Sequence, residues 1–288
     1  MKYKNFSITA IVPVYNEENS VKEVIEHLKK VMQATFERYE IVVVNDCSKD
    51  KSKEILQDIT GIHLINNPYN LGYSASIKRA LQNSKADYVV ITDADMTYPV
   101  EDIPKLAAHL EDYDMVVGSR TGKNVSIPLM RRPAKAMLNK LAKFVCNHDI
   151  PDLNSGLRIF DRKKAMQFYA MYPSRFSFTS TITLAFLTND YPVKYEPINY
   201  YKRRGKSTMK PKDFLMFISL INRIIFYFKP LKFFLIPGFV LLLGGLGFGG
   251  YQISTGGLGE TPVTLILVGI QLIFLGFVAD LIVKTRGH

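Results

Sequence analysis

The chain has 288 residues, of which 47% are hydrophobic and 22% are charged, and its formal net charge at pH 7 is +11. This composition excludes a disordered chain, because it supplies ample apolar surface for a core, and two cysteines without metal-ligand spacing exclude a disulfide scaffold. The positive charge is local, with +7 in residues 115–148 and +8 in residues 201–232, and such basic surfaces indicate a polyanionic partner: anionic lipid, a phosphorylated substrate or nucleic acid.

Strand-like and helix-like segments alternate over the first 120 residues. Continuous Val/Ile runs predict strands at residues 6–14, 39–45, 62–66, 87–92 and 114–118. Apolar periodicity predicts helices between them, at residues 18–36, 51–59, 73–82 and 101–111. Val/Ile runs separated by helices are typical of a parallel sheet buried on both faces. The predicted fold class is therefore α/β, with ligands at the carboxyl ends of the strands.

The C-terminal part predicts a membrane anchor. Residues 233–254 and 262–283 form two apolar segments of 22 residues, each long enough to cross a hydrocarbon core of about 30 Å. A pair of buried core helices is the alternative, which their length disfavours. Basic residues flank the pair but are missing from the loop inside it, so the positive-inside rule predicts that residues 1–232 and the C-terminus are cytoplasmic. The apolar segment at residues 209–230, rimmed by Lys and Arg, predicts an amphipathic helix in the interface plane, with a soluble core helix as the alternative.

Acidic and aromatic side chains follow several of the predicted strands. Two carboxylates, Asp93 and Asp95, come directly after the strand at 87–92, and further groups follow the first two strands. Because the carboxyl ends of parallel strands meet at one edge of a sheet, we expect these groups to line one cleft. Carboxylates two residues apart suit Mg²⁺ or Mn²⁺ carrying diphosphate oxygens, although an acidic turn that caps the next helix is an equally common structure. The set comprises Pro13, Tyr15, Glu17, Asp46, Asp93 and Asp95.

Five motifs occur in a recognisable order: IVPVYNEEN, VVVNDCSKD, NLGYSASIKRA, TDADMTYP and VVGSR. Together they cover about 120 residues, and in this order they resemble family 2 glycosyltransferases of the GT-A fold. The resemblance implies that the groups after the first two strands, Pro13 to Asp46, surround the base and ribose of a nucleotide sugar. It also implies that Asp93 and Asp95 bind ribose, diphosphate and a metal, Mg²⁺ or Mn²⁺.

Two downstream motifs narrow the resemblance. DLNSGLRIF at residues 152–160 and YKRRGKS at residues 201–207 are similar to segments of dolichyl-phosphate mannose synthases and related polyprenyl-phosphate glycosyltransferases. This implies a membrane-bound, inverting transferase that moves a sugar from a GDP- or UDP-linked donor to a polyprenyl or dolichyl phosphate, with its catalytic domain at residues 1–208 and its hairpin at 231–288. The chain has Thr97 where mannose synthases usually have Gln, and its hydroxyl is expected to hold a metal-bound water.

The basic residues are expected to bind the two phosphate groups of such a reaction. Arg120 ends the fifth strand beside the expected diphosphate, and we assign catalytic roles to Arg120, Asp95 and Asp152, the last orienting the acceptor or the sugar. Lys206 is assigned to the nucleotide sugar. The lipid phosphate is assigned to Arg120, Arg131, Lys135 and Arg203. A charge that faces solvent or lipid headgroups is the alternative for each basic residue taken alone.

Other functions are compatible with parts of this pattern. A dehydrogenase or a phosphate-loop protein is disfavoured because the first strand is followed by neither G-x-G-x-x-G nor G-x-x-x-x-G-K-[ST]. A processive polysaccharide synthase needs a Q-x-x-R-W element, and the chain has no Trp. A non-catalytic membrane-tethered subunit is disfavoured by the intact acidic cluster. Nucleic acid is disfavoured as a partner, since the basic segments flank membrane-facing helices. The expected partners are a nucleotide sugar, a polyprenyl phosphate and the bilayer, and a homo-oligomer is compatible with the sequence.

Overall fold

The computed structural model describes residues 2–122, 143, 146, 148–174, 178–202, 226, 230–257 and 259–286. Contacts within the chain divide it into two units, Met1–Phe214 and Leu215–His288, which are described separately. The predicted interfacial helix at residues 209–230 lies outside the described residues, apart from Phe226 and Pro230.

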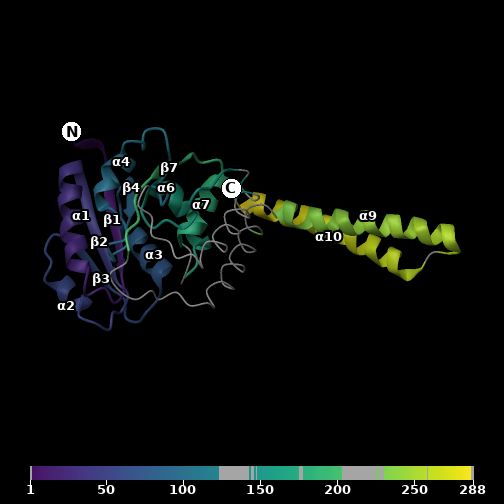
Figure 1. Ribbon diagram of the computed structural model, residues 1–288, viewed down its shortest axis with the longest axis horizontal. Helices are drawn as coiled ribbons and strands as arrows, with labels where there is room; N and C mark the ends of the chain where they lie inside the picture. Colours follow the sequence, from purple (N-terminus) through teal and green to yellow (C-terminus); the bar gives the residue numbers. More distant parts are fainter. Residues whose placement is uncertain are drawn as a thin grey trace. The chain divides into compact units, whose positions relative to one another are not determined.

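The first unit is built on a mixed sheet whose described strands lie in the order β3-β2-β1-β4-β6-β5-β7 (Figure 1). The strands are β1 (Tyr3–Val14), β2 (Phe36–Asn45), β3 (His63–Asn66), β4 (Tyr88–Ile91), β5 (Met115–Ser119), β6 (Arg158–Asp161) and β7 (Val193–Pro197). The neighbouring strands are parallel except at β6, which runs antiparallel to both β4 and β5. The predicted α/β class with a mainly parallel sheet is confirmed, whereas β6 and β7 were not predicted as strands.

Helices cover both faces of this sheet. They are α1 (Val21–Thr35), α2 (Ser52–Gln57), α3 (Tyr73–Asn83), α4 (Ile103–Ala107), α6 (Arg162–Gln167) and α7 (Phe178–Thr188), with 3-10 turns η1 (Val100–Asp102) and η3 (Tyr169–Met171). Helix α1 contacts α2 and α4, and α3 contacts α7. Figure 1 shows the strands lying between α1 and α3.

Two helices differ in extent from the prediction for local reasons. The helix expected at 18–36 begins only at Val21, because the amides of Ser20 and Val21 both donate to the carbonyl of Glu17 in a preceding turn. It ends at Thr35, since Phe36 takes an extended conformation and starts β2. The helix expected at 101–111 is shorter, because a 3-10 turn precedes α4 and turns follow it.

The core of the first unit lies between α1 and one face of the sheet. Alternate residues of β1, namely Ile8, Ala10 and Val12, are fully buried in it together with Ile25 and Leu28 of α1. Burying a side chain such as Leu or Ile contributes about 1.5–3 kcal/mol. This packing holds the strands in register and so fixes where their carboxyl ends lie.

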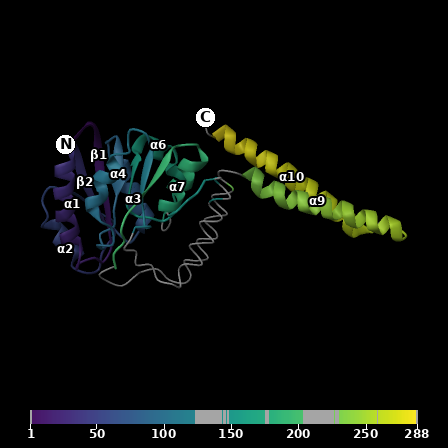
Figure 2. The ribbon, with the colours of Figure 1, turned by 45° about the horizontal axis from the view of Figure 1, so that its top comes forward.

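The second unit is a hairpin of two long helices, α9 (Pro230–Thr255) and α10 (Glu260–Arg286), which lie side by side in both views (Figure 2). In the described part of the chain these two are long and apolar enough to cross a membrane, with mean hydropathies of 2.0 and 2.5. They contain the predicted spans at 233–254 and 262–283. Large apolar side chains such as Val240, Leu246 and Phe274 are exposed along them, and an apolar surface of this extent suits a hydrocarbon environment.

Glycines bring the two helices into close contact. A Cβ atom at Gly269 would lie 2.7 Å from the backbone nitrogen of Leu242, and one at Gly245 would lie 2.8 Å from Cγ1 of Ile266. In contrast, a Cβ at Gly247 would meet nothing within 4 Å. Small residues at the contact points allow backbones to approach, which is a common packing mode of helices in lipid.

Candidate functional site

The carboxyl ends of several strands meet at one edge of the sheet. Val14 at the end of β1 pairs with Asn45 at the end of β2, and the amide of Thr92, just after β4, donates to Ile11 of β1. Strand β5 runs parallel to β4, because each is antiparallel to the intervening β6. The predicted site residues that follow β1, β2, β4 and β5 therefore lie along this edge.

Asp46 closes the loop between β3 and α3. Its buried carboxylate accepts hydrogen bonds from Asn67 Nδ2 at 2.8 Å and from the amides of Leu71 and Gly72 at 2.8 and 2.9 Å. Gly72 has a φ of 97°, a conformation that favours glycine. A predicted nucleotide-binding carboxylate is thus also the anchor for the start of α3.

The turn after β1 is tied to the turn after β4. Pro13 and Tyr15 are half-buried and Glu17 is buried. The hydroxyl of Ser20 donates to the carbonyl of Ala94 at 2.8 Å. This bond fixes the backbone between the two predicted metal ligands, a role that nothing in the sequence pattern assigned to Ser20.

Each aspartate of the predicted metal motif has one oxygen held by a hydroxyl group. Oδ1 of half-buried Asp93 accepts from the Tyr73 hydroxyl at 3.0 Å. Oδ1 of buried Asp95 accepts from Thr97 Oγ1 at 2.6 Å and from the Thr97 amide at 3.1 Å. Met96, between Asp95 and Thr97, has a φ of 62°, which makes the turn tight. The hydroxyl of Thr97, expected to hold a water, donates to Asp95.

The donor set of this turn fits a hard divalent cation. Mg²⁺ is commonly held by one or two carboxylates together with substrate phosphates and water, and Asp93 and Asp95 supply two carboxylates at the sheet edge. Within the described ranges, no three His, Cys, Asp or Glu side chains are grouped so that they could hold a metal ion. A cation at this turn would need further oxygens from a substrate or from water.

Arg120 and Asp152 form a bidentate ion pair. Arg120 Nε and Nη2 donate to Oδ2 and Oδ1 of Asp152 at 2.7 and 2.8 Å, and the Arg120 amide donates to Oδ2 at 3.0 Å. The Asp152 side chain is fully buried and that of Arg120 is 14% exposed. Burial alone would lower the pKa of Arg120, but Tyr98 and Asp152 outweigh burial and raise it. The guanidinium group therefore stays charged while both Asp152 oxygens accept from it.

The antiparallel strand β6 explains why Asp152 reaches this edge. Since β6 runs against β4 and β5, its first residue Arg158 lies opposite Ile91 and Val117, near their carboxyl ends. The loop before β6 therefore lies beside the turns after β4 and β5. A parallel β6 would have placed that loop at the opposite edge.

Within this loop, Gly156 lies directly against Asp93. A Cβ atom at Gly156 would be 2.8 Å from Asp93 Oδ2 and 2.9 Å from Tyr98 Cε2. The Gly156 amide donates to the Tyr98 hydroxyl at 2.7 Å. Burial raises the pKa of Tyr98, so its phenol stays neutral. The pKa of Tyr73 is likewise raised, first by burial and then by the charge of Asp93.

A buried arginine links the loop before β6 to helix α7. Arg158 is fully buried, and its Nη1 donates to the Thr179 carbonyl at 2.8 Å and to Thr183 Oγ1 at 2.7 Å, both on α7. Its Nε donates to the carbonyl of Ser155 at 3.1 Å. Burial lowers the pKa of Arg158. Arg158 lies in the DLNSGLRIF motif, but nothing in the sequence pattern indicated that its side chain anchors this loop.

Arg131, Lys135, Arg203 and Lys206 lie outside the described residues.

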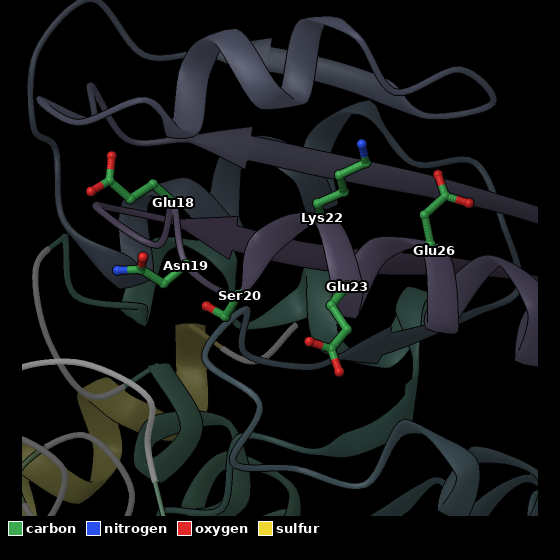
Figure 3. A pocket seen from close by; sticks show the side chains of 6 residues that line it. All are labelled: Glu18, Asn19, Ser20, Lys22, Glu23 and Glu26. Atoms are coloured by element: carbon green, nitrogen blue, oxygen red, sulfur yellow. The ribbon is translucent and has the colours of Figure 1, made fainter.

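A shallow depression of about 260 Å³ lies over the start of α1 (Figure 3). It is lined by Glu18, Asn19, Ser20, Lys22, Glu23 and Glu26. Figure 3 shows Lys22 and Glu23 pointing in opposite directions, so the charged groups do not converge on one centre. The depression contains none of the predicted site residues.

The chain is similar in sequence to a known family and to several of its relatives. The family described as glycosyl transferase family 2 matches residues 9–168. Hexosyltransferase Agl6 of low-salt glycan biosynthesis from Haloferax volcanii is 28% identical over an alignment of 290 positions, which covers 94% of this chain and 67% of the relative. The uncharacterized glycosyltransferase YkcC from Bacillus subtilis is 27% identical, covering 97% of this chain and 89% of its own length.

Two further similarities cover part of the chain. Undecaprenyl-phosphate 4-deoxy-4-formamido-L-arabinose transferase from Pseudomonas fluorescens is 30% identical over an alignment of 167 positions, which covers 56% of this chain and 48% of that protein. A crystal structure of glucosyl-3-phosphoglycerate synthase from Mycobacterium tuberculosis, in complex with Mn²⁺, UDP and phosphoglyceric acid, superposes with a TM-score of 0.58 at 17% identity, covering 77% of this chain and 78% of that one. This last similarity bears on the fold, and it confirms the predicted GT-A class.

Proposed function

The chain belongs to glycosyl transferase family 2, and on this premise we propose that it transfers a sugar from a GDP- or UDP-linked donor to a polyprenyl phosphate. The observation that carries the proposal is the sheet edge where Asp93 and Asp95 lie near the Arg120–Asp152 pair. The relatives named for undecaprenyl phosphate support the lipid acceptor. The apolar hairpin supports it too, because a chain anchored in a bilayer meets a lipid substrate at its surface.

The donor would bind along the carboxyl ends of β1, β2 and β4. The proposed contacts with the base and ribose come from the carboxyl ends of β1 and β2, and they are made by Pro13, Tyr15, Glu17 and Asp46. Asp46 has bonds from its own chain on both oxygens, so a contact with ribose would add to an already fixed carboxylate. Such preorganisation lowers the cost of binding. Lys206 is proposed to contact the nucleotide sugar.

The proposed reaction is a single displacement with inversion. An oxygen of the acceptor phosphate attacks the anomeric carbon of the sugar, the new carbon–oxygen bond forms, and the bond to the nucleoside diphosphate breaks. A phosphate monoester is already an anion near pH 7, its second pKa being about 6, so the attack needs no proton acceptor. This agrees with Asp152, whose oxygens accept from Arg120. We therefore assign Asp152 to hold Arg120 in place.

Asp93 and Asp95 are proposed to hold Mg²⁺ or Mn²⁺. When bound, the cation supplies positive charge to the departing diphosphate. Arg120 lies at the same edge as a permanent cation, and a guanidinium group matches phosphate oxygens in geometry. The Mn²⁺ in the solved structure of similar fold supports a divalent metal.

The acceptor side of the site is proposed to include Arg120, Arg131, Lys135 and Arg203. A lipid phosphate would approach from the cytoplasmic face, where the positive-inside rule places residues 1–232. Residues 1–208 would form the catalytic domain, residues 209–230 an interfacial segment, and residues 231–288 the two spans.

The test is product formation by the purified full-length protein in detergent. The protein is incubated with undecaprenyl phosphate, Mg²⁺ or Mn²⁺ and each of a panel of UDP- and GDP-sugars, and the lipids are analysed by mass spectrometry. We expect a lipid-linked monosaccharide from one class of donor, and its loss in Asp95→Asn. A blank across the whole panel would contradict the proposal and favour a non-catalytic subunit.

A further inference from the structure

Two hydroxyl groups from separate parts of the chain hold the candidate metal ligands. Tyr73 is the first residue of α3, and its hydroxyl donates to Asp93 Oδ1 at 3.0 Å. Thr97 lies in the turn after β4, and its hydroxyl donates to Asp95 Oδ1 at 2.6 Å. One oxygen of each carboxylate is thus held by a hydroxyl group.

We propose that Tyr73 and Thr97 are positioning residues that set the orientation of Asp93 and Asp95 for a divalent cation. The inference rests on the proposed function, since it assumes that these two aspartates bind metal. A carboxylate has a broad range of rotation about its terminal bond, and a hydrogen bond to one oxygen restricts it. Groups that hold metal ligands in this way typically change metal affinity by 10- to 100-fold when they are removed.

The position of Tyr73 is itself fixed from the other side of the site. Asp46 accepts the amides of Leu71 and Gly72, the two residues that precede Tyr73. The carbonyl of Ser174 accepts the amide of Ala75, which secures the other side of the first turn of α3. Tyr73 thus extends from a turn that is held by Asp46, the candidate nucleotide-binding residue. The start of α3 therefore connects the proposed nucleotide site with the proposed metal site.

Thr97 is held in a comparable way by its surroundings. Its side chain is almost fully buried, and its carbonyl accepts the amide of Tyr201 at 3.0 Å. The Thr97 amide donates to Asp95 Oδ1 as well as the hydroxyl. Removing the hydroxyl alone therefore leaves one bond to Asp95, and we expect a smaller effect at Thr97 than at Tyr73.

The experiment measures Mn²⁺ binding directly, by electron paramagnetic resonance of free Mn²⁺ titrated with the full-length protein in detergent. Titrations are run with Mn²⁺ alone and again with UDP or GDP present. The variants are Tyr73→Phe, Thr97→Val and Thr97→Ser. The matched control is Tyr88→Phe, which removes a phenol that donates to the Leu110 carbonyl at 3.2 Å.

We expect the dissociation constant for Mn²⁺ to rise about 10-fold or more in Tyr73→Phe, and by less in Thr97→Val. Thr97→Ser keeps the hydroxyl and should bind like the wild type, as should Tyr88→Phe. In the transfer assay, the Mn²⁺ concentration for half-maximal rate should rise in Tyr73→Phe more than kcat falls. A merely structural role would change thermal stability and leave the Mn²⁺ dissociation constant unchanged.

The outcomes separate this inference from the proposed function. Wild-type Mn²⁺ affinity in both Tyr73→Phe and Thr97→Val would overturn the inference while leaving sugar transfer intact. A wild-type protein that transfers sugar but binds no Mn²⁺ would overturn the inference and the metal role together. If the protein binds Mn²⁺ with the expected variant effects and forms no lipid-linked product, the positioning role stands and the proposed reaction is wrong.

Discussion

Gly156 offers a direct test of how the loop before β6 shapes the site. The change Gly156→Ala would place a methyl carbon 2.9 Å from Tyr98 Cε2 and 2.8 Å from Asp93 Oδ2. Carbon atoms in contact are normally 3.5–4.0 Å apart, so a gap of roughly 0.6 Å or more must open. Tyr98 is buried and its hydroxyl accepts the Gly156 amide. We therefore expect half-buried Asp93 to move.

The cost of this overpacking is about 1–3 kcal/mol of unfolding free energy. A similar loss of transition-state stabilisation would lower the transfer rate by about 10-fold or more, since 1.4 kcal/mol corresponds to a factor of ten. The rate is measured as lipid-linked product. Stability is measured by heating the protein with a thiol-reactive dye, whose signal above the labelling of half-buried Cys47 reports exposure of buried Cys146.

The control for an added methyl group is Gly247→Ala, where a Cβ would meet nothing within 4 Å. This variant should keep wild-type activity and stability. The reasoning is refuted if Gly156→Ala is as active and as stable as the wild type, because Asp93 would then not depend on the close approach of the loop.

Three further changes test other parts of the structure. Asp152→Ala leaves the largely buried guanidinium of Arg120 without its bidentate partner, and we expect a loss of about 3–5 kcal/mol of unfolding free energy, measured by the same dye assay. The backbone amide and the hydroxyl of Ser7 both donate to the Asp87 carboxylate and hold its pKa below the usual range. The stability that Asp87 contributes is therefore present above about pH 3.9 and is lost as the pH falls through the lower pKa of the folded state. In circular dichroism melts, Asp87→Asn should be less stable than the wild type at pH 7 and equally stable in strong acid. Gly269→Leu should disrupt the helical hairpin, seen as a lower melting temperature in detergent.

For each of these variants, one result would contradict the prediction. Wild-type stability in Asp152→Ala would show that the buried ion pair is not needed for folding. A constant difference between Asp87→Asn and the wild type at every pH would mean that the carboxylate charge makes no contribution. The control for the hairpin is Gly247→Leu, whose side chain enters open space; equal effects at Gly247 and Gly269 would contradict the assigned helix contact.

The first half of the fold could be predicted from the sequence because most of its strands contain runs of Val and Ile. Strand β2 contains the run at 41–44, all of it buried, and the helices between strands show clear apolar periodicity. The carboxylates after β2 and β4 follow directly from this pattern, since parallel strands bring their carboxyl ends to one edge. The hairpin could be predicted from length and hydropathy alone.

The rest of the site depends on contacts that have no local signature. Strand β6 has four residues, and nothing in them indicates that it pairs antiparallel with β4 and β5. That direction alone brings Asp152 to Arg120 and Gly156 to Asp93. Tyr73 is a half-buried residue at a helix start, and its bond to Asp93 spans 20 residues of sequence. Such long-range pairs follow from topology, which a single sequence does not display.

In the proposed reaction, sugar leaves the nucleotide only when a lipid phosphate receives it. The most direct measurement is release of UDP or GDP by the purified protein, with and without undecaprenyl phosphate, alongside the amount of lipid-linked sugar. We predict one nucleoside diphosphate released for each lipid-linked sugar formed, and no release without the lipid phosphate. Release that is independent of lipid phosphate, or that exceeds the lipid-linked product, would contradict the proposed reaction.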